Sequence, residues 1–158
     1  MEIERKWLLH RLPARHADNM YWVEQFYIST EPEIRLRRCK PNGDYENKKP
    51  FVMTLKSGGT LSREEVETAV TEEFYELALD MINLDPIQKN FLVYNEGGHK
   101  VEVSVILNDE KFVYAEVEFA SEEEAKAYQF PWPDLVEKEV TDNPEYKMKN
   151  YWKRVRNI

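Results

Sequence analysis

Charged and apolar residues alternate along residues 1–9, and this alternation constrains the fold more than any other feature of the chain. In M-E-I-E-R-K-W-L-L, Glu2, Glu4 and Lys6 alternate with apolar or arginine positions, and Ile3 and Trp7 fall in the opposite phase. Successive side chains of a β-strand point to opposite faces of the sheet, so Glu2, Glu4 and Lys6 share one face. Similar alternation returns later in the chain, which predicts a protein built mainly of strands with one charged and one apolar face.

Further strands are expected wherever this alternation recurs. The expected segments are 21–29, 33–40, 51–56, 63–67, 87–94, 100–105, 112–120 and 135–140. Gly58 with Gly59 and Gly97 with Gly98 mark turns between strands, and residues 41–50 are expected to form a loop. Short strands separated by turns favour antiparallel pairing.

Helices are expected at three places. Thr71 is the expected N-cap of a helix with an apolar stripe, for which core packing is the simplest interpretation. This stripe consists of Phe74, Leu77, Ala78, Met81 and Ile82. Ser121 and Glu124 have the spacing of a capping box, which predicts a short helix to about Tyr128. Asn143 followed by Pro144 predicts a C-terminal helix. Its apolar stripe would consist of Met148, Tyr151, Trp152 and Val155.

Composition indicates a single globular domain, and the strand and helix patterns predict the class mainly β (α+β). The 158 residues are 42% hydrophobic and 33% charged, which suits a packed core and argues against disorder. The formal net charge of -8 argues against a nucleic acid or an anionic membrane as partner, so any anion must bind to a local cluster of cations. Cys39 is the only cysteine, and no apolar run approaches the length of a membrane span, so we expect a cytoplasmic protein.

The strands could form either a sandwich or a closed barrel, and the alternation alone leaves both open. In a sandwich, the charged faces would lie in water and would need no ligand. In a barrel with the charged faces inward, carboxylates and cations would crowd a confined lumen, where they are costly to desolvate unless they pair or bind a ligand. A barrel would therefore predict a binding site inside the lumen.

Several short motifs resemble those of one known family in the same order along the chain. The opening E-I-E-R-K resembles the signature of the CYTH superfamily, also called the triphosphate tunnel metalloenzymes. The later motifs are Q-F-Y at 25–27, R-L-R at 35–37, T-L-K at 54–56, R-E-E-V-E at 63–67, A-E-V-E-F at 115–119 and K-E-V-T-D at 138–142, followed by Tyr146. Because the motifs span nearly the whole chain, the resemblance is more specific than a single E-x-E-x-K.

The resemblance implies a closed eight-stranded antiparallel β-barrel with flanking helices, whose tunnel binds a linear triphosphate and a divalent cation. The cations that would hold the triphosphate are Lys6, Arg35, Arg37, Lys56, Arg63 and Lys138. The carboxylates that would bind Mg²⁺ or Mn²⁺ are Glu2, Glu4, Glu116 and Glu118. Glu65 and Glu67 would help to orient the attacking water, and Lys89 would be a general base or a phosphate ligand.

Three positions depart from the family pattern. Phe91 lies two residues after Lys89, at the position where the family usually has an arginine. Ser104 replaces the second residue of an acidic pair. Tyr146 is followed by Lys147 and Met148, whereas the family usually has a small or basic residue and then an asparagine. These departures weaken any inference about rate or substrate, but the expected metal carboxylates are all present.

Within the superfamily, we expect hydrolysis of inorganic triphosphate by a metal-dependent phosphoanhydride hydrolase. The alternatives are an organic triphosphatase, acting on thiamine triphosphate or a nucleoside triphosphate, and a non-catalytic module that binds polyphosphate or a nucleotide, for which Phe91 is the best argument. A class IV adenylyl cyclase is less favoured, because no His-Phe pair precedes the E-x-E-x-K here. The expected partner is a small triphosphate compound, and a homodimer is compatible with the sequence.

Overall fold

Antiparallel β-sheet forms most of the computed structural model, which describes residues 1–40, 49–109 and 111–158. The strands are β1 (Glu2–Leu9), β2 (Asn19–Thr30), β3 (Glu33–Lys40), β4 (Phe51–Lys56), β5 (Ser62–Arg63), β6 (Glu65–Ala69), β7 (Ile87–Glu96), β8 (His99–Ile106), β9 (Val113–Glu118) and β10 (Val136–Glu139). Their order across the sheet is β10-β1-β9-β8-β7-β2-β3-β4-β6, and β5 pairs with β1. Most of the loop expected at 41–50 lies outside the described residues.

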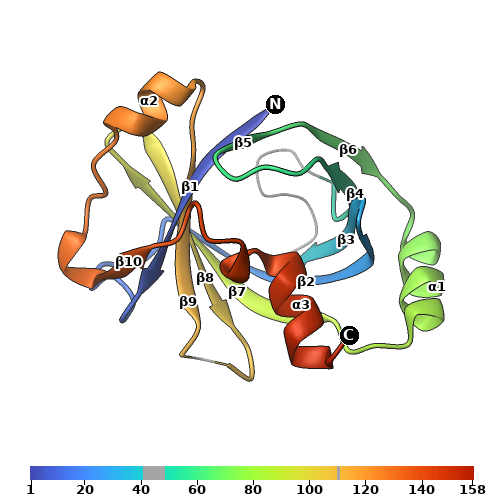
Figure 1. The fold of residues 1–158 in the computed structure, drawn as a ribbon. Helices are drawn as coiled ribbons and strands as arrows, with labels where there is room; N and C mark the ends of the chain where they lie inside the picture. Colours follow the sequence, from blue (N-terminus) through green and yellow to red (C-terminus); the bar gives the residue numbers. More distant parts are fainter. Residues whose placement is uncertain (41–48, 110) are drawn as a thin grey trace.

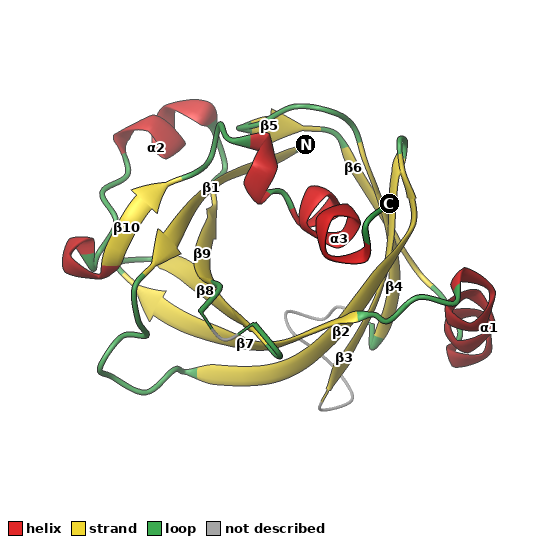
Figure 2. Ribbon diagram, turned by 60° about the horizontal axis from the view of Figure 1, so that its bottom comes forward, coloured by secondary structure: helices red, strands yellow, loops and turns green. Residues whose placement is uncertain are grey.

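The segment that contains β5 and β6 nearly closes this sheet into a barrel (Figures 1 and 2). β6 pairs with β4, whereas β5 pairs with β1 through Glu2 with Arg63 and Ile3 with Ser62. This arrangement confirms the tunnel fold. The expected count of eight strands is met around the lumen only when β5 and β6 are taken as one interrupted strand. The interruption lies at Glu64, and β10 adds a further strand beside the end of β1.

The register of the ladders gathers the charged strand faces inside the barrel. Glu4 lies opposite Glu118 and Lys6 opposite Glu116 in the β1–β9 pair, whereas Arg35 lies opposite Tyr27 in the β2–β3 pair. Residues directly opposite each other in a ladder point to the same side of the sheet, so one continuous inner face carries both carboxylates and cations.

Apolar side chains on the outer faces pack under the covering segments. On β1, β8 and β9, the residues Trp7, Val103 and Val117 belong to one buried cluster with Leu135 and the half-buried Trp132. The helix α2 (Glu122–Ala127) and the 3-10 helix η1 (Pro133–Leu135) lie over this side of the barrel (Figure 1). The Ser121 hydroxyl accepts from the Glu124 backbone N–H, which confirms the predicted N-cap, whereas the Glu124 carboxylate accepts from the N–H of Ala120, one residue before the N-cap.

The helix α1 (Glu72–Ile82) forms as predicted, but the packing prediction for its apolar stripe is wrong in part. The Thr71 side chain caps the helix by accepting from the Phe74 N–H. Tyr75 is fully buried, with its ring 5.2 Å from that of Phe26. Phe74, Leu77 and Met81, by contrast, are exposed. Ala78 and Ile82 are half-buried, so the helix covers only part of its apolar stripe.

The predicted C-terminal helix is divided into two. Asn143 caps the 3-10 helix η2 (Pro144–Tyr146) by accepting from the Glu145 N–H, and Lys147 then has an extended backbone before α3 (Met148–Arg156) begins. Tyr151 and Trp152 are buried as expected, whereas Val155 is half exposed. α3 lies across one opening of the barrel (Figure 2), and the Trp152 ring lies 5.9 Å from that of Tyr27. Among the described helices, none combines the length and the apolar character needed to cross a membrane.

Candidate active site

The barrel lumen contains two cavities that share the same central side chains. Glu4, Arg35, Lys56, Lys89 and Glu116 line both of them. The first cavity extends toward η2 and α3 and holds about 600 Å³ of space free of protein atoms, including the part open to solvent. The second extends toward the other end of β1 and holds about 580 Å³ on the same measure.

Nearly all of the site residues predicted from the sequence meet in this lumen. The first cavity adds Lys6 and Arg63 to the shared residues. The second adds the predicted residues Glu2, Arg37, Glu65 and Glu118. Glu67 borders an adjoining hollow that it shares with Glu2, Glu65 and Glu118. The alternation of inward and outward side chains along β1, β3, β4 and β9 is what brings these residues together.

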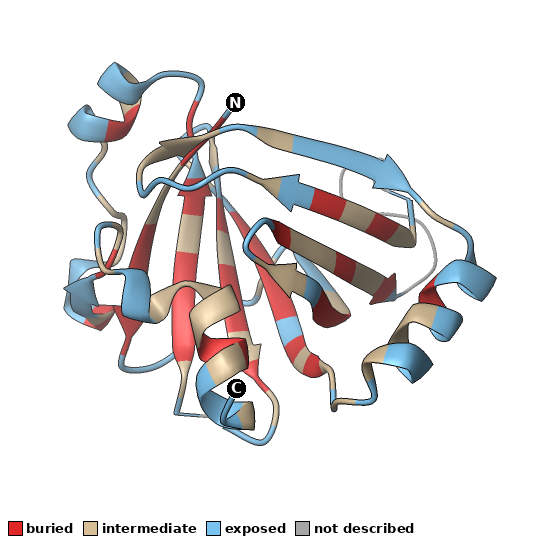
Figure 3. Cartoon of the chain, turned by 45° about the vertical axis from the view of Figure 1, so that its right-hand side comes forward, coloured by how far each residue is buried: buried red, intermediate tan, exposed pale blue. Residues whose placement is uncertain are grey.

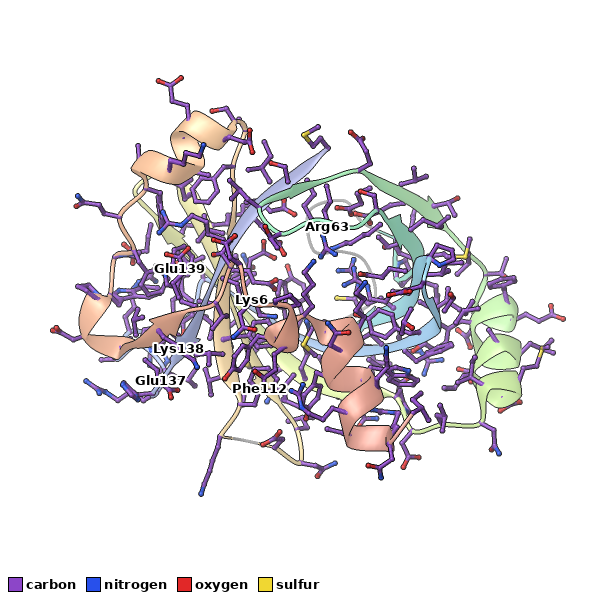
Figure 4. All side chains as sticks on the ribbon, viewed as in Figure 1. Lys6, Arg63, Phe112, Glu137, Lys138 and Glu139 are labelled. Atoms are coloured by element: carbon purple, nitrogen blue, oxygen red, sulfur yellow. The ribbon has the colours of Figure 1, made fainter. Side chains whose placement is uncertain are left out.

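Lys138 is the exception among the predicted cations. It lies on β10, is exposed, and lines neither of the two described cavities. Its Nζ lies 5.0 Å from the centre of the Tyr146 ring. Figure 4 shows Lys138 with Glu137 and Glu139 on the far side of β1 from Arg63. β10 continues the sheet beside the end of β1, away from the lumen, so the structure does not bring Lys138 to the other cations.

A network of ion pairs links the four strands β1, β3, β4 and β5 at the seam of the barrel. The Lys56 Nζ lies 3.1 Å from the Glu2 carboxylate, and the Arg63 Nε lies 3.4 Å from it. Arg63 also donates to Glu33 at 3.1 Å. Burial by itself raises the pKa of Glu2, but Lys56 and Arg63 outweigh burial and bring this pKa down to about 2. Glu2 is therefore ionised at neutral pH and can act as a permanent anionic ligand.

Two lysines and a tyrosine meet where the two cavities join. The Lys89 Nζ donates to the Tyr114 hydroxyl at 3.0 Å, and the Lys6 Nζ lies 4.1 Å from the centre of the Tyr114 ring. Burial lowers the pKa of Lys89 to about 7, with Arg35 and Lys6 acting in the same direction and Glu116 opposing them. An amine with this pKa is present at neutral pH in both its charged and its neutral form, so Lys89 can accept a proton.

The carboxylates of Glu2, Glu4 and Glu118 converge at one end of the lumen. Each offers an oxygen, and these oxygens lie within 4.8 Å of one another. Burial raises the pKa of Glu4 well above its usual value, and the neighbouring Glu116 and Glu2 raise it further. Like charges held this close favour a cation between them, and carboxylate oxygens are the hard ligands that Mg²⁺ and Mn²⁺ prefer. The residues present therefore fit a divalent cation.

Glu116 and Glu65 differ from that group in their surroundings. Within the described residues, the converging group does not include Glu116. Burial raises the pKa of Glu116, but Lys6 and Lys89 bring it below its usual value. For Glu65, burial together with Glu67 and Glu2 raises the pKa to about 8. Glu116 is therefore paired electrostatically with Lys6 and Lys89. Glu65 is mainly protonated at neutral pH while no metal ion is bound.

The two arginines of β3 carry donors that the protein itself leaves unused. Among the described residues, the buried Arg35 Nε and Arg37 Nη2 have no hydrogen-bond partner. A buried N–H without a partner is unfavourable, so such donors indicate a ligand that accepts hydrogen bonds. Guanidinium groups match the geometry of phosphate oxygens particularly well.

The three departures from the family pattern have different surroundings. Phe91 is buried in a cluster with Val23 and Cys39, at the wall of the second cavity. Ser104 is fully buried and lies beside Phe91 in the β7–β8 ladder. Lys147 lines the first cavity, and its ammonium donates to the Gly59 carbonyl.

Sequence reasoning missed two buried polar residues of the lumen. Glu33 lines the first cavity as the counter-ion of Arg63, and Gln25 lines the second. Both could have been found from the alternation, because Glu33 is in phase with Arg35 and Gln25 is in phase with Tyr27.

Comparison with known proteins identifies relatives in sequence and in structure. The chain is 30% identical over 150 residues to the inorganic triphosphatase of Nitrosomonas europaea, and the alignment covers 94% of each protein. The solved structure of the inorganic triphosphatase NE1496 matches with a TM-score of 0.65 at 28% identity, covering 96% of this chain and 93% of that one. The PH1012 protein from Pyrococcus horikoshii OT3 has a TM-score of 0.55 at 17% identity, covering 80% of this chain and 84% of that one, and supports the fold alone.

No protein-family model matches the chain. Sequence identity of 30% over nearly the full length of both proteins nevertheless shows common descent with the triphosphatase. The order of motifs and the charged lumen agree with that relationship. The chain therefore belongs to the CYTH superfamily, the triphosphate tunnel metalloenzymes.

Proposed function

We propose that this protein hydrolyses inorganic triphosphate inside its tunnel, with Mg²⁺ or Mn²⁺ as cofactor. The observation that carries the proposal is the lumen itself, where the buried Lys6 and Lys89 and the half-buried Arg35 and Lys56 lie beside a group of converging carboxylates. A linear triphosphate carries several negative charges, and a confined lumen strengthens their attraction to these cations. The relationship to the triphosphatase of Nitrosomonas europaea supports the same substrate.

The basic side chains hold the phosphate chain and set its position. Arg35 and Arg37 have free buried donors for phosphate oxygens, and Lys56 and Arg63 reach the same lumen from β4 and β5. Together they fix the terminal phosphorus in place for attack by water.

Lys89 is placed to take the proton of the attacking water. As the water oxygen forms its bond to the terminal phosphorus, the bridging P–O bond breaks, and the products are phosphate and pyrophosphate. The neutral form of Lys89 accepts the proton at Nζ, and Tyr114 keeps this nitrogen in position through the 3.0 Å hydrogen bond. Glu65 and Glu67, at the same end as the metal carboxylates, orient the water.

Glu2, Glu4 and Glu118 would hold the divalent cation. When bound, such a cation would neutralise charge on the phosphate oxygens and make the phosphorus more electrophilic. Their pKa shifts support this role, because Glu2 is already ionised and Glu4 is relieved of repulsion from its neighbours when a cation is present.

A phosphate-release assay tests the proposal. The purified protein is incubated with inorganic triphosphate, ATP, thiamine triphosphate or pyrophosphate, each with Mg²⁺, with Mn²⁺ or with EDTA. We expect release of phosphate to be fastest from inorganic triphosphate and to disappear in EDTA. Faster release from thiamine triphosphate or ATP would replace the proposed substrate with an organic triphosphate. Binding of triphosphate without hydrolysis under any of these conditions would refute the enzymatic function.

A further inference from the structure

Gln25, the first residue of the Q-F-Y motif, is a fully buried polar residue to which the proposed mechanism gives no role. It lies in the middle of β2, has an exposed fraction of 0%, and lines the second cavity together with Arg35 and Arg37. Among the described residues, neither its Oε1 nor its Nε2 has a hydrogen-bond partner. A buried side-chain amide with both ends unsatisfied is rare in a folded protein.

Within the described residues, the protein itself supplies no hydrogen bond that would make this amide stabilising. Burying a polar group that makes no hydrogen bond is unfavourable, whereas methionine would fill a similar space without that penalty. The neighbouring inner-face residues Val23 and Tyr27 on β2 show that this face also accepts apolar and aromatic side chains. A partner that accepts hydrogen bonds inside the cavity would satisfy the amide N–H.

The neighbours of Gln25 indicate the chemistry of that partner. Gln25 lies directly opposite Arg37 in the β2–β3 ladder, and the next inward pair is Tyr27 with Arg35. The Arg35 Nε and the Arg37 Nη2 also have no partner among the described residues. Three buried N–H donors without acceptors thus line one cavity, and phosphate oxygens are the acceptors that such a set recognises.

We infer that Gln25 is a substrate-binding residue, whose amide N–H donates to a phosphate oxygen while its carbonyl accepts from Arg37. This inference rests on the proposed function, since it takes inorganic triphosphate as the ligand. A neutral donor is suited to this place, because Arg35, Arg37 and Lys89 already crowd the cavity with positive charge. The amide adds a hydrogen bond to the substrate without adding repulsion to the empty tunnel.

Gln25→Met is the variant that tests the inference, and Gln88→Met is its matched control. Gln88 lies on the neighbouring strand β7, outside the lumen cavities, and donates to Glu24 at 3.1 Å. Triphosphate binding is measured by calorimetry in EDTA, and melting temperatures are measured without ligand. Steady-state hydrolysis of triphosphate with Mg²⁺ gives KM and kcat.

For Gln25→Met we expect a melting temperature about 2–4 °C higher without ligand, because an unsatisfied buried amide is removed. We also expect triphosphate to bind about tenfold more weakly or worse, since a hydrogen bond to a charged group is lost. The control Gln88→Met should show neither the higher melting temperature nor the weaker binding. A gain in stability combined with a loss of affinity is a result that a purely structural role would not produce.

Gln25→Glu provides a second, nearly isosteric variant. Its carboxylate would pair with Arg37 and repel triphosphate, so binding should weaken more than in Gln25→Met. Wild-type affinity in both variants, or a lower melting temperature for Gln25→Met, would overturn the inference. If the wild type binds triphosphate without hydrolysing it and Gln25→Met binds it more weakly, the proposed function fails while the role of Gln25 stands.

Discussion

Replacing Lys89 with arginine separates the two roles that a buried cation can have in this tunnel. Lys89 either accepts a proton from water or only binds phosphate. Arginine retains the positive charge and the hydrogen-bond donors, but its pKa is too high for it to act as a base. Lys89→Arg should therefore preserve triphosphate binding and abolish most of the turnover if Lys89 is the base.

The size of the effect follows from the pKa of Lys89. With this pKa lowered from 10.5 to about 7, about half of the protein carries a neutral Lys89 at pH 7. A lysine with the unshifted pKa would be neutral in only roughly one molecule in three thousand. General base catalysis typically contributes about 10²–10⁴-fold, so we expect kcat of Lys89→Arg to fall at least about a hundredfold. We expect the Kd for triphosphate to change less than about threefold, because the charge is retained.

The pH dependence gives an independent measure of the same group. Because the neutral form is the active one, kcat/KM of the wild type should rise with pH through a midpoint near 7 and level off above it. The rising limb should be absent from the residual activity of Lys89→Arg. Rates of phosphate release at saturating and subsaturating triphosphate give kcat and kcat/KM. They are measured between pH 5.5 and about 9, a range that spans the titration of this lysine.

Lys126→Arg is the control, because Lys126 is exposed on α2 outside the barrel. It should leave kcat, Kd and the pH profile unchanged. Retention of more than about half of the wild-type kcat in Lys89→Arg would refute the assignment of Lys89 as the base, since arginine cannot accept the proton. A fall in affinity as large as the fall in kcat would instead make Lys89 a phosphate ligand.

Three further predictions concern the metal carboxylates and the cations. Glu4→Gln and Glu118→Gln should each lower Mg²⁺-dependent hydrolysis about a hundredfold while the fold is retained, because each removes an anionic ligand at constant volume. Full activity in both variants, with an unchanged Mg²⁺ titration, would contradict the metal site. Arg35→Ala and Lys56→Ala should raise the Kd for triphosphate about tenfold or more, which calorimetry in EDTA measures; unchanged affinity in both would place the phosphate site elsewhere. Lys138→Ala should leave KM and kcat within about twofold of the wild type, because this exposed lysine lies outside the lumen; a large increase in KM would show that β10 contributes to the site.

The strand faces could be predicted from sequence because their period is local. Alternation along residues 1–9 and 33–40 is sufficient to place Lys6 on the same strand face as Glu2 and Glu4, and Arg35 on the same face as Arg37. The structure shows that both faces line the lumen. Alternation does not say whether a charged face points to solvent or to a lumen. That choice depends on the closure of the sheet through β5 and β1, which are about sixty residues apart in the chain and whose pairing no local pattern encodes.

The predictions that differ from the structure concern features that are set by tertiary packing. Phe74, Leu77 and Met81 have the spacing of a core stripe, but α1 packs on the barrel through Tyr75 and leaves these three side chains exposed. The single C-terminal helix was predicted from the cap at Asn143, whereas the extended backbone at Lys147 divides it and lays α3 over the tunnel opening. Lys138 was assigned by motif alone, and the position of β10 beside the end of β1 keeps it out of the lumen.

The seam between β1 and β5 distributes stability unevenly around the wall of the barrel. The other ladders around the lumen have four to eight residue pairs, such as the eight pairs of β7 with β8, whereas β5 meets β1 through two pairs. Most of β6 is also exposed (Figure 3). Local opening of a protein starts where few buried contacts and short ladders hold the backbone. Amide hydrogens of residues 62–69 should therefore exchange with solvent faster than those of β7 and β8. The segment that carries Arg63 can open locally while the rest of the barrel stays folded.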